Sequence, residues 1–325
     1  MLPERLQIGD EIRVIAPSRS MALLKSKQVD VALSRLHDLG FHVTFGKHVD
    51  VHDEFFSTSI EQRIEDLHQA FLDDRVKAVL TAIGGYNANQ LLNFIDYDLI
   101  KDHPKILCGY SDITALQLAL YKQTGLITYS GPFFSTFGMK KEIDYTIQSF
   151  LQAVTNDAMY EIEPSDYWSD DKWYEDQENR TFYPQQHYEV INEGTATGTL
   201  IGGNLSTLNL LQGTAFFPSL NNAILFIEDD EENHPFLFDR HLQALLHLPD
   251  AVHIQALLIG RFQKGSHMTM EALQKIIHDK RELKDIPIIA NVNFGHTDPI
   301  ATIPIGAKAS VKAFHQQTEI IISQS

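Results

Sequence analysis

The sequence KILCGYSDITALQLALYKQTG, residues 105–125, places a serine between a short apolar segment and a segment with helical apolar spacing. Lys105–Cys108 predicts a buried strand, and Asp112–Leu120 predicts a helix that ends near Gly125. A hydroxyl at such a turn projects above the edge of a sheet, where backbone N–H groups at the start of the helix can bind a developing oxyanion. Ser111 is therefore a candidate nucleophile, and a helix-capping role is an equally good interpretation of this segment alone.

Strand and helix signals alternate on both sides of this segment, through about the first 140 residues. The pattern predicts an α/β fold with a mostly parallel sheet and helices on both faces. In open α/β sheets, functional residues gather at the carboxyl ends of strands, and the Gly84-Gly85 turn and the Ser111 turn both lie at such ends. We therefore expect the two turns to face each other across one crevice. Expected strands are residues 11–17, 41–45, 75–83 and 105–108, and expected helices are residues 25–40 and 59–72, the second opened by a capping box of Ser59 and Gln62.

The second half of the chain mixes strands and helices again, which predicts an α+β domain. Expected strands are residues 196–204, 222–229, 253–262, 286–294, 307–314 and 318–322, and expected helices lie near residues 235–248 and 269–283. We divide the chain into an N-terminal domain, a linker with an aromatic loop, and a C-terminal domain, at residues 1–140, 141–188 and 189–325.

The aromatic loop carries both tryptophans of the chain, Trp168 and Trp173, in a polar run at residues 164–176. Plain linkers rarely contain so many large rings. The loop therefore either folds over a ligand or packs against a neighbouring domain.

Composition limits the classes of function. With 43% apolar and 21% charged residues, the chain has the composition of an ordinary soluble globular protein. It has no apolar run of the ~20 residues that a membrane span needs, and its acidic N-terminus does not resemble a signal peptide, so we expect a cytoplasmic protein with no membrane partner. The formal net charge of −17, without a basic stripe, makes nucleic acid an unfavourable partner.

Cys108 is the only cysteine, which excludes an internal disulfide and a cysteine-based metal cluster. Its position inside an apolar strand favours a small buried hydrophobe. An amidotransferase-like enzyme acting through Cys108 is the alternative.

Two residues could activate Ser111, because a serine needs a base and the base needs an orienting group. Glu228 is the first carboxylate after the apolar segment 222–227, and the four acids that follow it are better interpreted as solvated. His296 follows the apolar segment 286–294 and a glycine, which is a good position for a base. Because the chain contains 15 histidines, position alone does not separate His296 from a packing or surface histidine.

Other chemistries fit less well. His241 and His247 lack the i,i+4 spacing of a zinc helix and no His-Glu-x-x-His run occurs, so we expect no metal and no cofactor. The sequence Gly84-Gly85-Tyr86-Asn87 matches neither a dinucleotide turn nor a phosphate loop, and its simplest interpretation is a tight turn before a helix capped by Asn87. Ile113 stands where a Gly-x-Ser-x-Gly elbow would require glycine, which disfavours an ordinary α/β-hydrolase.

Six ordered motifs together resemble the serine peptidase family that contains the LD-carboxypeptidases and the microcin C immunity peptidases. The resemblance covers nearly the whole chain and is far more specific than any single motif. The motifs are GD at 9–10 with VIAPS at 14–18, AIGGY at 82–86, GYSD at 109–112, GTLIGGNL at 198–205, IED at 227–229 and NFGH at 293–296.

The resemblance implies a doubly wound N-terminal domain and a smaller mixed C-terminal domain, with the site between them, often in a homodimer. It implies that Ser111 is the nucleophile, His296 the general base and Glu228 its orienting partner. The matching oxyanion hole is formed by the backbone N–H groups of Gly85 and Asp112. Two further residues of the matching motifs, Tyr86 and Asn204, are expected to bind substrate.

The resemblance further implies hydrolysis of an amide near the carboxyl end of the substrate, through an acyl-enzyme on the serine. LD-carboxypeptidases remove the terminal D-alanine of a murein tetrapeptide during cell-wall recycling. The immunity branch instead cuts the amide between a peptide or aminoacyl group and a nucleotide-like moiety. A non-catalytic protein that binds the same ligands is the alternative from another class.

The aromatic loop favours the immunity branch. The segment between Ser111 and Glu228 is longer than in the short LD-carboxypeptidases, and the excess lies at residues 168–183. In the immunity branch an aromatic residue of this loop stacks on adenine, which Trp173, or less readily Trp168, could do here, since stacking on a base is worth roughly 1–3 kcal/mol. A tryptophan that only pins the loop to its neighbour is the structural alternative.

Overall fold

Five strands from the N-terminal half of the chain and one from near its C-terminus form a six-stranded sheet, in a computed structural model that describes residues 1–185 and 187–324. The strand order is β14-β5-β4-β3-β1-β2, parallel throughout except for β14, which runs antiparallel to β5. The strands are β1 (Glu11–Ile15), β2 (His42–Phe45), β3 (Val76–Thr81), β4 (Ile106–Gly109), β5 (Thr128–Ser130) and β14 (Ile303–Ile305).

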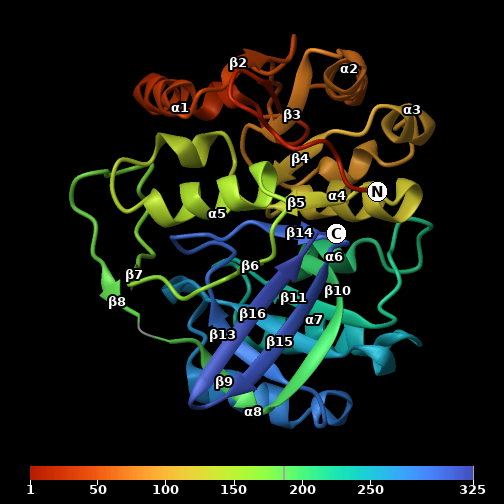
Figure 1. Cartoon of the computed structure of the whole chain (residues 1–325), viewed down its shortest axis with the longest axis vertical. Coiled ribbons are helices and arrows are strands. Elements are labelled where there is room, and N and C mark those ends of the chain that lie inside the picture. Colours follow the sequence, from red (N-terminus) through yellow and green to blue (C-terminus); the bar gives the residue numbers. More distant parts are fainter. Residues whose placement is uncertain (186, 325) are drawn as a thin grey trace.

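Helices flank this sheet on both sides, with α1 and α5 on one side of the strands and α2, α3 and α4 on the other (Figure 1). The start of α2 and the end of α4 have the capping residues that the sequence predicts. The hydroxyl of Ser59 accepts a bond from the backbone N–H of Gln62 at the start of α2, and Gly125 ends α4 at a φ of 74°. The helices are α1 (Ser26–Asp38), α2 (Ile60–Leu72), α3 (Tyr97–Asp102), α4 (Ile113–Thr124) and α5 (Asp144–Thr155).

The C-terminal half builds an eight-stranded mixed sheet in the order β6-β16-β15-β10-β11-β12-β13-β9. Its central strands β10 to β13 are parallel, and the outer strands are antiparallel to their neighbours. The strands are β6 (Tyr160–Glu161), β9 (Glu189–Asn192), β10 (Gly194–Asn204), β11 (Ala223–Glu228), β12 (Ala256–Gly260), β13 (Ile288–Val292), β15 (Lys308–Phe314) and β16 (Gln317–Ser323).

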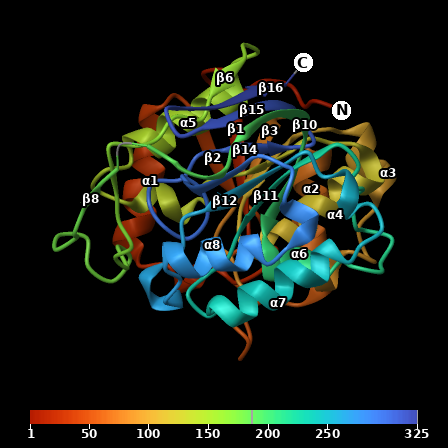
Figure 2. The same cartoon turned by 90° about the horizontal axis from the view of Figure 1, so that it is seen from below.

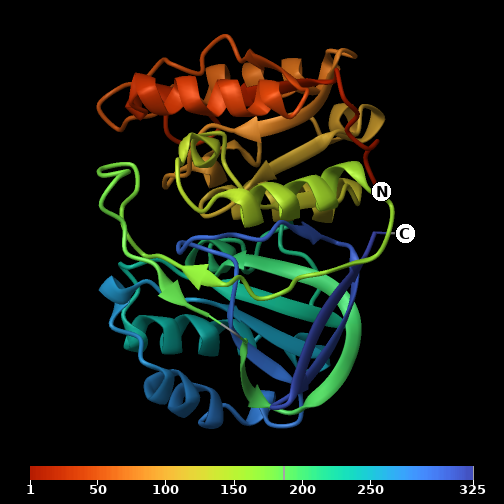
Figure 3. The same cartoon turned by 60° about the vertical axis from the view of Figure 1, so that its left-hand side comes forward.

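Helices α7 and α8 lie side by side against this second sheet (Figure 2), and the two sheets are stacked one above the other along the molecule (Figure 3). The helices of this half are α6 (Leu205–Asn209), α7 (Pro235–Leu246) and α8 (Met270–His278). Short 3-10 helices are η1 (Met21–Leu23), η2 (Ala88–Leu91), η3 (Ser135–Gly138), η4 (Ala251–His253), η5 (Lys264–Ser266) and η6 (Arg281–Leu283). No helix within residues 1–185 and 187–324 is long and apolar enough to cross a bilayer.

The structure corrects the expectation for the segment after Gly84-Gly85. A 3-10 helix, η2, follows Asn87 in place of a capped α-helix, and the Asn87 side chain forms no cap bond. The Asn87 carboxamide oxygen instead accepts a hydrogen bond from the guanidinium of Arg63 at 3.1 Å. The expected cap is therefore wrong because a tertiary partner occupies its oxygen.

The polar run between the two sheets is anchored at several points. A two-stranded pair, β7 (Tyr167–Trp168) and β8 (Tyr183–Pro184), closes it into a loop. Ser169 then forms a reciprocal backbone pair with Asp298, at 2.8 and 2.9 Å. The aromatic loop is thus fixed to the segment that follows β13.

Candidate active site

Four chain segments that carry predicted site residues end at the junction of the two sheets. Gly84 follows β3 and Ser111 follows β4 in the first sheet, whereas Glu228 ends β11 and His296 follows β13 in the second. The carboxyl ends of parallel strands meet at one edge of a sheet, so the fold itself brings these segments together.

Ser111 lies on a tight strand-to-helix turn between β4 and α4. Its φ of 58° is in the left-handed region, which non-glycine residues adopt rarely and at a cost of about 1–3 kcal/mol. Such strain is typical of an exposed nucleophile, and the turn holds it although no glycine follows at Ile113.

A hydrogen-bonded chain joins three of the predicted residues. The Nε2 atom of His296 lies 3.0 Å from Oγ of Ser111, and Nδ1 lies 2.6 Å from Oε2 of Glu228. An ionised carboxylate only accepts hydrogen bonds, so Nδ1 carries a proton and the neutral ring presents its Nε2 lone pair to the serine hydroxyl. This arrangement can remove a proton from Ser111.

Electrostatics around His296 favour its protonated form. Burial lowers the pKa of the imidazole, but the charge of Glu228 and its hydrogen bond outweigh burial and raise the pKa to about 9. The Glu228 side chain is only 4% exposed, so its charge is poorly screened by solvent. The ring of Tyr110 packs edge-on against the imidazole, with 5.3 Å between ring centroids.

Two glycines leave room for Glu228. A Cβ atom at Gly260 would lie 2.8 Å from Cβ of Glu228, and one at Gly295 would lie 2.6 Å from its Oε2. Gly295 also has a φ of 103°, which side chains other than glycine rarely adopt. The glycine before His296 therefore serves to let the carboxylate and the imidazole approach.

The Gly84-Gly85 turn lies against Ser111, as expected from the strand ends. A Cβ atom at Gly84 would lie 3.3 Å from Cβ of Ser111, and one at Gly85 would lie 2.2 Å from Oγ of Ser18. The backbone N–H groups of Gly85 and Asp112 donate to no atom of the described residues. These two donors are free to bind an oxyanion beside the serine.

The Asp112 side chain ties this region together. Its Oδ2 accepts a hydrogen bond from the Ser18 hydroxyl at 2.6 Å and another from the backbone N–H of Ala88 at 2.9 Å. One buried carboxylate thus connects the segments that follow β1, β3 and β4. Ser18 belongs to the motif at residues 14–18, but no local pattern predicts this contact with Asp112.

Asn204 lies behind Glu228, outside the wall of the cleft that Ser111 opens into. Its side-chain N–H₂ group is 3.2 Å from both Oε1 of Glu228 and Oδ1 of Asp229, and only 2% of the residue is exposed. In this position the Asn204 amide bridges the two carboxylates, and its expected contact with substrate stays a prediction. Asp229 also corrects an expectation: it is buried and bonded to Asn233 at 2.8 Å, whereas the acids after Glu228 were expected to be solvated.

Ser111 and His296 open into a cleft of about 500 Å³. The aromatic loop forms one wall through Trp173 and its neighbour Tyr174, and Tyr86 forms part of another. Among the described residues, six acidic residues line the cleft, against Arg19, Lys172 and the protonated form of His296; the acids are Asp170, Asp171, Asp230, Glu231, Glu232 and Asp298.

The two tryptophans face different spaces. Trp173 lines the cleft, whereas Trp168 lines a neighbouring cavity. The Trp168 ring is held by cation–π contacts, with Arg261 at 4.9 Å and Lys264 at 5.3 Å from its centroid. Trp168 is therefore placed to anchor the loop, and Trp173 to meet a ligand.

The turn after His296 contains a residue that sequence reasoning missed. Asp298 lines the cleft, and its carboxylate lies 2.9 Å from Nη2 of Arg180, whose side chain is fully buried. Burial raises the pKa of Asp298 to about 7, although Arg180 acts to lower it. No local pattern signals this pair, because the two residues are far apart in the chain.

The alternative nucleophile, Cys108, is fully buried inside β4, and burial raises the pKa of its thiol well above the usual range. A thiol that cannot ionise is a poor nucleophile, so this geometry argues against chemistry at Cys108. No group of three or more potential metal ligands occurs in the part of the chain that the structure describes.

Family models match the chain as an LD-carboxypeptidase N-terminal domain over residues 12–131 and an LD-carboxypeptidase C-terminal domain over residues 197–311. The chain belongs to the LD-carboxypeptidase family. A family member from Bacillus subtilis (strain 168), named "Putative carboxypeptidase YocD", is 53% identical over the full length of both chains.

Solved structures of this LD-carboxypeptidase family share the whole fold. An MccF-like protein from Bacillus anthracis str. Ames superimposes with a TM-score of 0.99, with 51% identity and coverage of 100% of both chains. The microcin C7 self-immunity protein MccF, in complex with aspartyl sulfamoyl adenosine, gives a TM-score of 0.90 and 29% identity, covering 100% of this chain and 99% of that one. The predicted family and two-domain α/β architecture are confirmed.

Proposed function

We propose that this protein is a serine carboxypeptidase in which Ser111 is the nucleophile, His296 the general base and Glu228 the residue that orients His296. The observation that carries the proposal is the chain of hydrogen bonds from Glu228 through His296 to Ser111, at 2.6 and 3.0 Å. The two free N–H groups of Gly85 and Asp112 beside the serine add the expected oxyanion site.

The reaction follows from this geometry. Oγ of Ser111 attacks the amide carbonyl while Nε2 of His296 takes the hydroxyl proton, and the N–H groups of Gly85 and Asp112 stabilise the oxyanion. The imidazolium then protonates the leaving nitrogen, the C–N bond breaks and an acyl-serine forms. Water, deprotonated by His296, attacks the acyl-serine and releases the carboxylic acid and free Ser111.

The substrate in this proposal is a small peptide or aminoacyl group joined by an amide to a nucleotide-like moiety. Two observations support it: MccF, a relative with the same fold, binds aspartyl sulfamoyl adenosine, and the half-buried Trp173 lines the cleft of this chain. Removal of the terminal D-alanine from a murein tetrapeptide is the second candidate, which the LD-carboxypeptidase family models favour.

A first experiment separates catalysis from mere binding. We expect Ser111→Ala to lower kcat by at least about 10³-fold, because a serine–histidine pair acts as a unit. Mass spectrometry after treatment with a serine-directed phosphonate should give one adduct, on Ser111. Wild-type turnover by Ser111→Ala would defeat the proposal, and absence of both turnover and adduct would favour a non-catalytic binder.

A second experiment separates the two substrates. We expect faster hydrolysis of an aminoacyl sulfamoyl adenosine than of a murein tetrapeptide. Trp173→Ala should raise KM for the first substrate by roughly tenfold or more, since base stacking is worth roughly 1–3 kcal/mol. Trp168→Ala, in the same loop but facing the other cavity, is the matched control and should have a smaller effect. Preference for the tetrapeptide would select the second candidate.

Two further parts of the proposal concern the cellular location and the oligomeric state of the enzyme. We further propose a cytoplasmic location, as expected from the sequence, and a homodimer, which the family resemblance implies. Cell fractionation and light scattering on the purified protein test them, and a monomer at micromolar concentration would contradict the dimer.

A further inference from the structure

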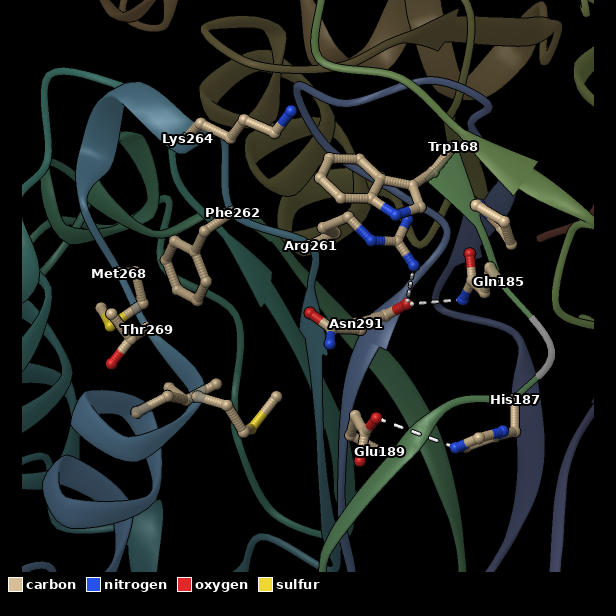
Figure 4. Close-up of a pocket in the computed structure, with 13 residues that line it drawn as sticks. Trp168, Gln185, His187, Glu189, Arg261, Phe262, Lys264, Met268, Thr269 and Asn291 are labelled. Atoms are coloured by element: carbon tan, nitrogen blue, oxygen red, sulfur yellow. Dashed lines mark hydrogen bonds and ion pairs between the residues drawn. The ribbon is translucent and has the colours of Figure 1, made fainter. Parts of the chain in front are cut away.

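A second cavity, of about 370 Å³, lies beside the catalytic cleft in the C-terminal half. It is enclosed by Trp168 of β7, the segment that follows β12, the beginning of α8 and Asn291 (Figure 4). The backbone N–H of Lys264 in its wall donates to Asp170 in the wall of the catalytic cleft, at 2.6 Å. The cavity is therefore a neighbour of the catalytic cleft with walls of its own.

Its most unusual wall residue is Arg261, a buried cation without a counter-ion. Arg261 is only 6% exposed, and its strongest hydrogen bond goes to a neutral group, the carbonyl oxygen of Asn291, at 3.0 Å. Among the described residues, no carboxylate forms an ion pair with it. Burial lowers the pKa of Arg261 to about 10, so the side chain stays charged at neutral pH. An unpaired buried charge is costly, and in a chain with a net charge of −17 its isolation is notable.

A second cation faces the same space. Nζ of Lys264 lies 5.3 Å from the centroid of the Trp168 ring and 3.5 Å from that of Tyr183. Lys264 is exposed, and among the residues described its ammonium forms no ion pair, although its charge acts on the nearby Asp170 carboxylate. The one acid in the described wall, Glu189, faces His187 at 3.8 Å. The buried charge of Arg261 is thus not neutralised by an acid in the described wall of the cavity.

Asn291 supplies a free polar group. Its φ is 60°, and its carbonyl oxygen accepts bonds from both Arg261 and Gln185, which fixes the backbone in this rare conformation. The side-chain amide extends toward Phe262 and Thr269 (Figure 4), and it forms no hydrogen bond with any residue in the described ranges. The wall of the cavity therefore includes a polar amide without a hydrogen-bond partner among these residues.

The remaining wall is apolar. It consists of Phe262, which is 8% exposed, together with Met268 and two side chains of α8, Met270 and Leu273. Methionine side chains adapt to ligands of different shape. The cavity thus pairs one cationic end with one apolar side, and its volume falls in the range of about 300–1,000 Å³ that is common for small-molecule sites.

We propose that this cavity binds a small organic anion, with a carboxylate or phosphate group between Arg261, Lys264 and the Asn291 amide, and an apolar body against Phe262 and Met268. The ligand supplies the counter-charge that the protein lacks, because a charge-assisted hydrogen bond is the usual partner of a buried guanidinium. This site is separate from the proposed peptidase site and does not depend on it.

The two tryptophans provide a direct assay. In Trp173→Phe the only tryptophan is Trp168, which lies in the wall of the cavity. Phenyl phosphate and benzoate should each change its fluorescence saturably at constant ionic strength, and neutral benzamide should bind roughly tenfold more weakly or worse. The two anions distinguish a phosphate from a carboxylate ligand. Equal affinity for benzamide and both anions, or no saturable change with either anion, would overturn the proposal.

Charge-removing variants in the same background locate the site. Arg261→Met should weaken binding of the better anion by roughly tenfold or more, and Lys264→Met by a smaller factor. Lys172→Met, which removes one positive charge from the catalytic cleft, is the matched control and should leave Kd unchanged. Unaltered binding in both Arg261→Met and Lys264→Met would refute the assignment. Circular dichroism shows whether Arg261→Met folds. If it does not, the test is the comparison of the anion Kd in Lys264→Met with that in Lys172→Met.

Discussion

His296 is subject to opposing electrostatic influences, and their balance sets the pH at which Ser111 can be activated. Burial opposes its protonation, and the carboxylate of Glu228 promotes it more strongly, which gives a pKa of about 9. Only the neutral imidazole accepts the serine proton. The fraction of active enzyme is therefore expected to increase with pH up to about 9.

This balance predicts the pH profile of a variant. In Glu228→Gln the raising charge is absent, so the acid limb of kcat/KM should move to lower pH than in the wild type. The maximal rate should nevertheless fall by roughly 10³-fold or more, because the imidazole loses its orienting partner. Rates measured from pH 5 to 10 on an aminoacyl sulfamoyl adenosine test both effects. An acid limb at the same pH in both proteins would show that Glu228 does not set the pKa of His296.

The same pair has a consequence for stability. A histidine with a raised pKa in the folded state stabilises the fold at pH values below its unfolded pKa, and this contribution disappears as pH increases through the folded pKa. For His296 the contribution is lost between pH 6.5 and about 9. The free energy of unfolding of the wild type, measured by urea denaturation, should thus decrease across this interval relative to that of Glu228→Gln.

At the scale of elements, one of the anchors of the aromatic loop is a buried ion pair. The side chain of Arg180, within the loop, contacts Asp298, which follows β13 and is also paired with Ser169 through the backbone. This junction connects the segment that carries Trp173 to the turn that carries His296. Substrate binding and catalytic geometry therefore share one attachment point.

Breaking this attachment should affect binding more than chemistry. We expect Arg180→Met to raise KM by roughly tenfold while kcat changes less, because Trp173 loses its fixed position whereas His296 keeps Glu228. Lys140→Met, which breaks the exposed pair with Glu178 at 2.8 Å near the same loop, is the control and should change little, since exposed pairs contribute about 0–1 kcal/mol. A fall in kcat at constant KM would contradict this role for Arg180.

Sequence patterns predicted the elements that have long periodic signals, and they failed where the signal is short. The strand-turn-helix at residues 105–125 was recognisable because its strand is uniformly apolar and its helix ends in glycine. Strands β5 and β14 contain only three residues each, too few to show a period, and their pairing joins distant parts of the chain. The Arg180–Asp298 pair and the burial of Asp229 also depend on contacts between distant parts of the chain, which no local pattern shows. The sequence favours Trp173 over Trp168 as the ring that meets a ligand, and Trp173 is the one that lines the cleft.

At the scale of the whole molecule, the two halves are interlocked. Strand β14 belongs to the C-terminal part of the sequence, yet it pairs with β5 at the edge of the first sheet, where Ile303 lies opposite Ser130. The strand follows shortly after His296 in the chain. This crossover anchors the histidine turn on the sheet that carries Ser111, so the relative position of base and nucleophile does not rely on domain packing alone.

The net charge of −17 is reflected in the cleft, where six acidic residues face Arg19, Lys172 and His296, which is protonated below its pKa of about 9. A cationic substrate is therefore attracted over long distances and an anionic one is repelled. If the proposed function is correct, kcat/KM should be higher for lysyl than for glutamyl sulfamoyl adenosine. The difference should shrink between 0.1 and 1 M salt, where the Debye length falls from about 10 to 3 Å.

One exposed acid in the cleft allows this effect to be localised. Glu232→Gln should reduce the preference for the lysyl substrate, because Glu232 lines the cleft and lies 3.4 Å from the hydroxyl of Tyr86. Asp38→Asn changes the net charge equally at the exposed end of α1, and it should leave the preference intact. If both variants reduce the preference equally, the overall charge acts alone and the cleft acids have no special role. A preference for the glutamyl substrate at low salt would contradict the electrostatic argument, since the cleft is lined by more acidic than cationic residues.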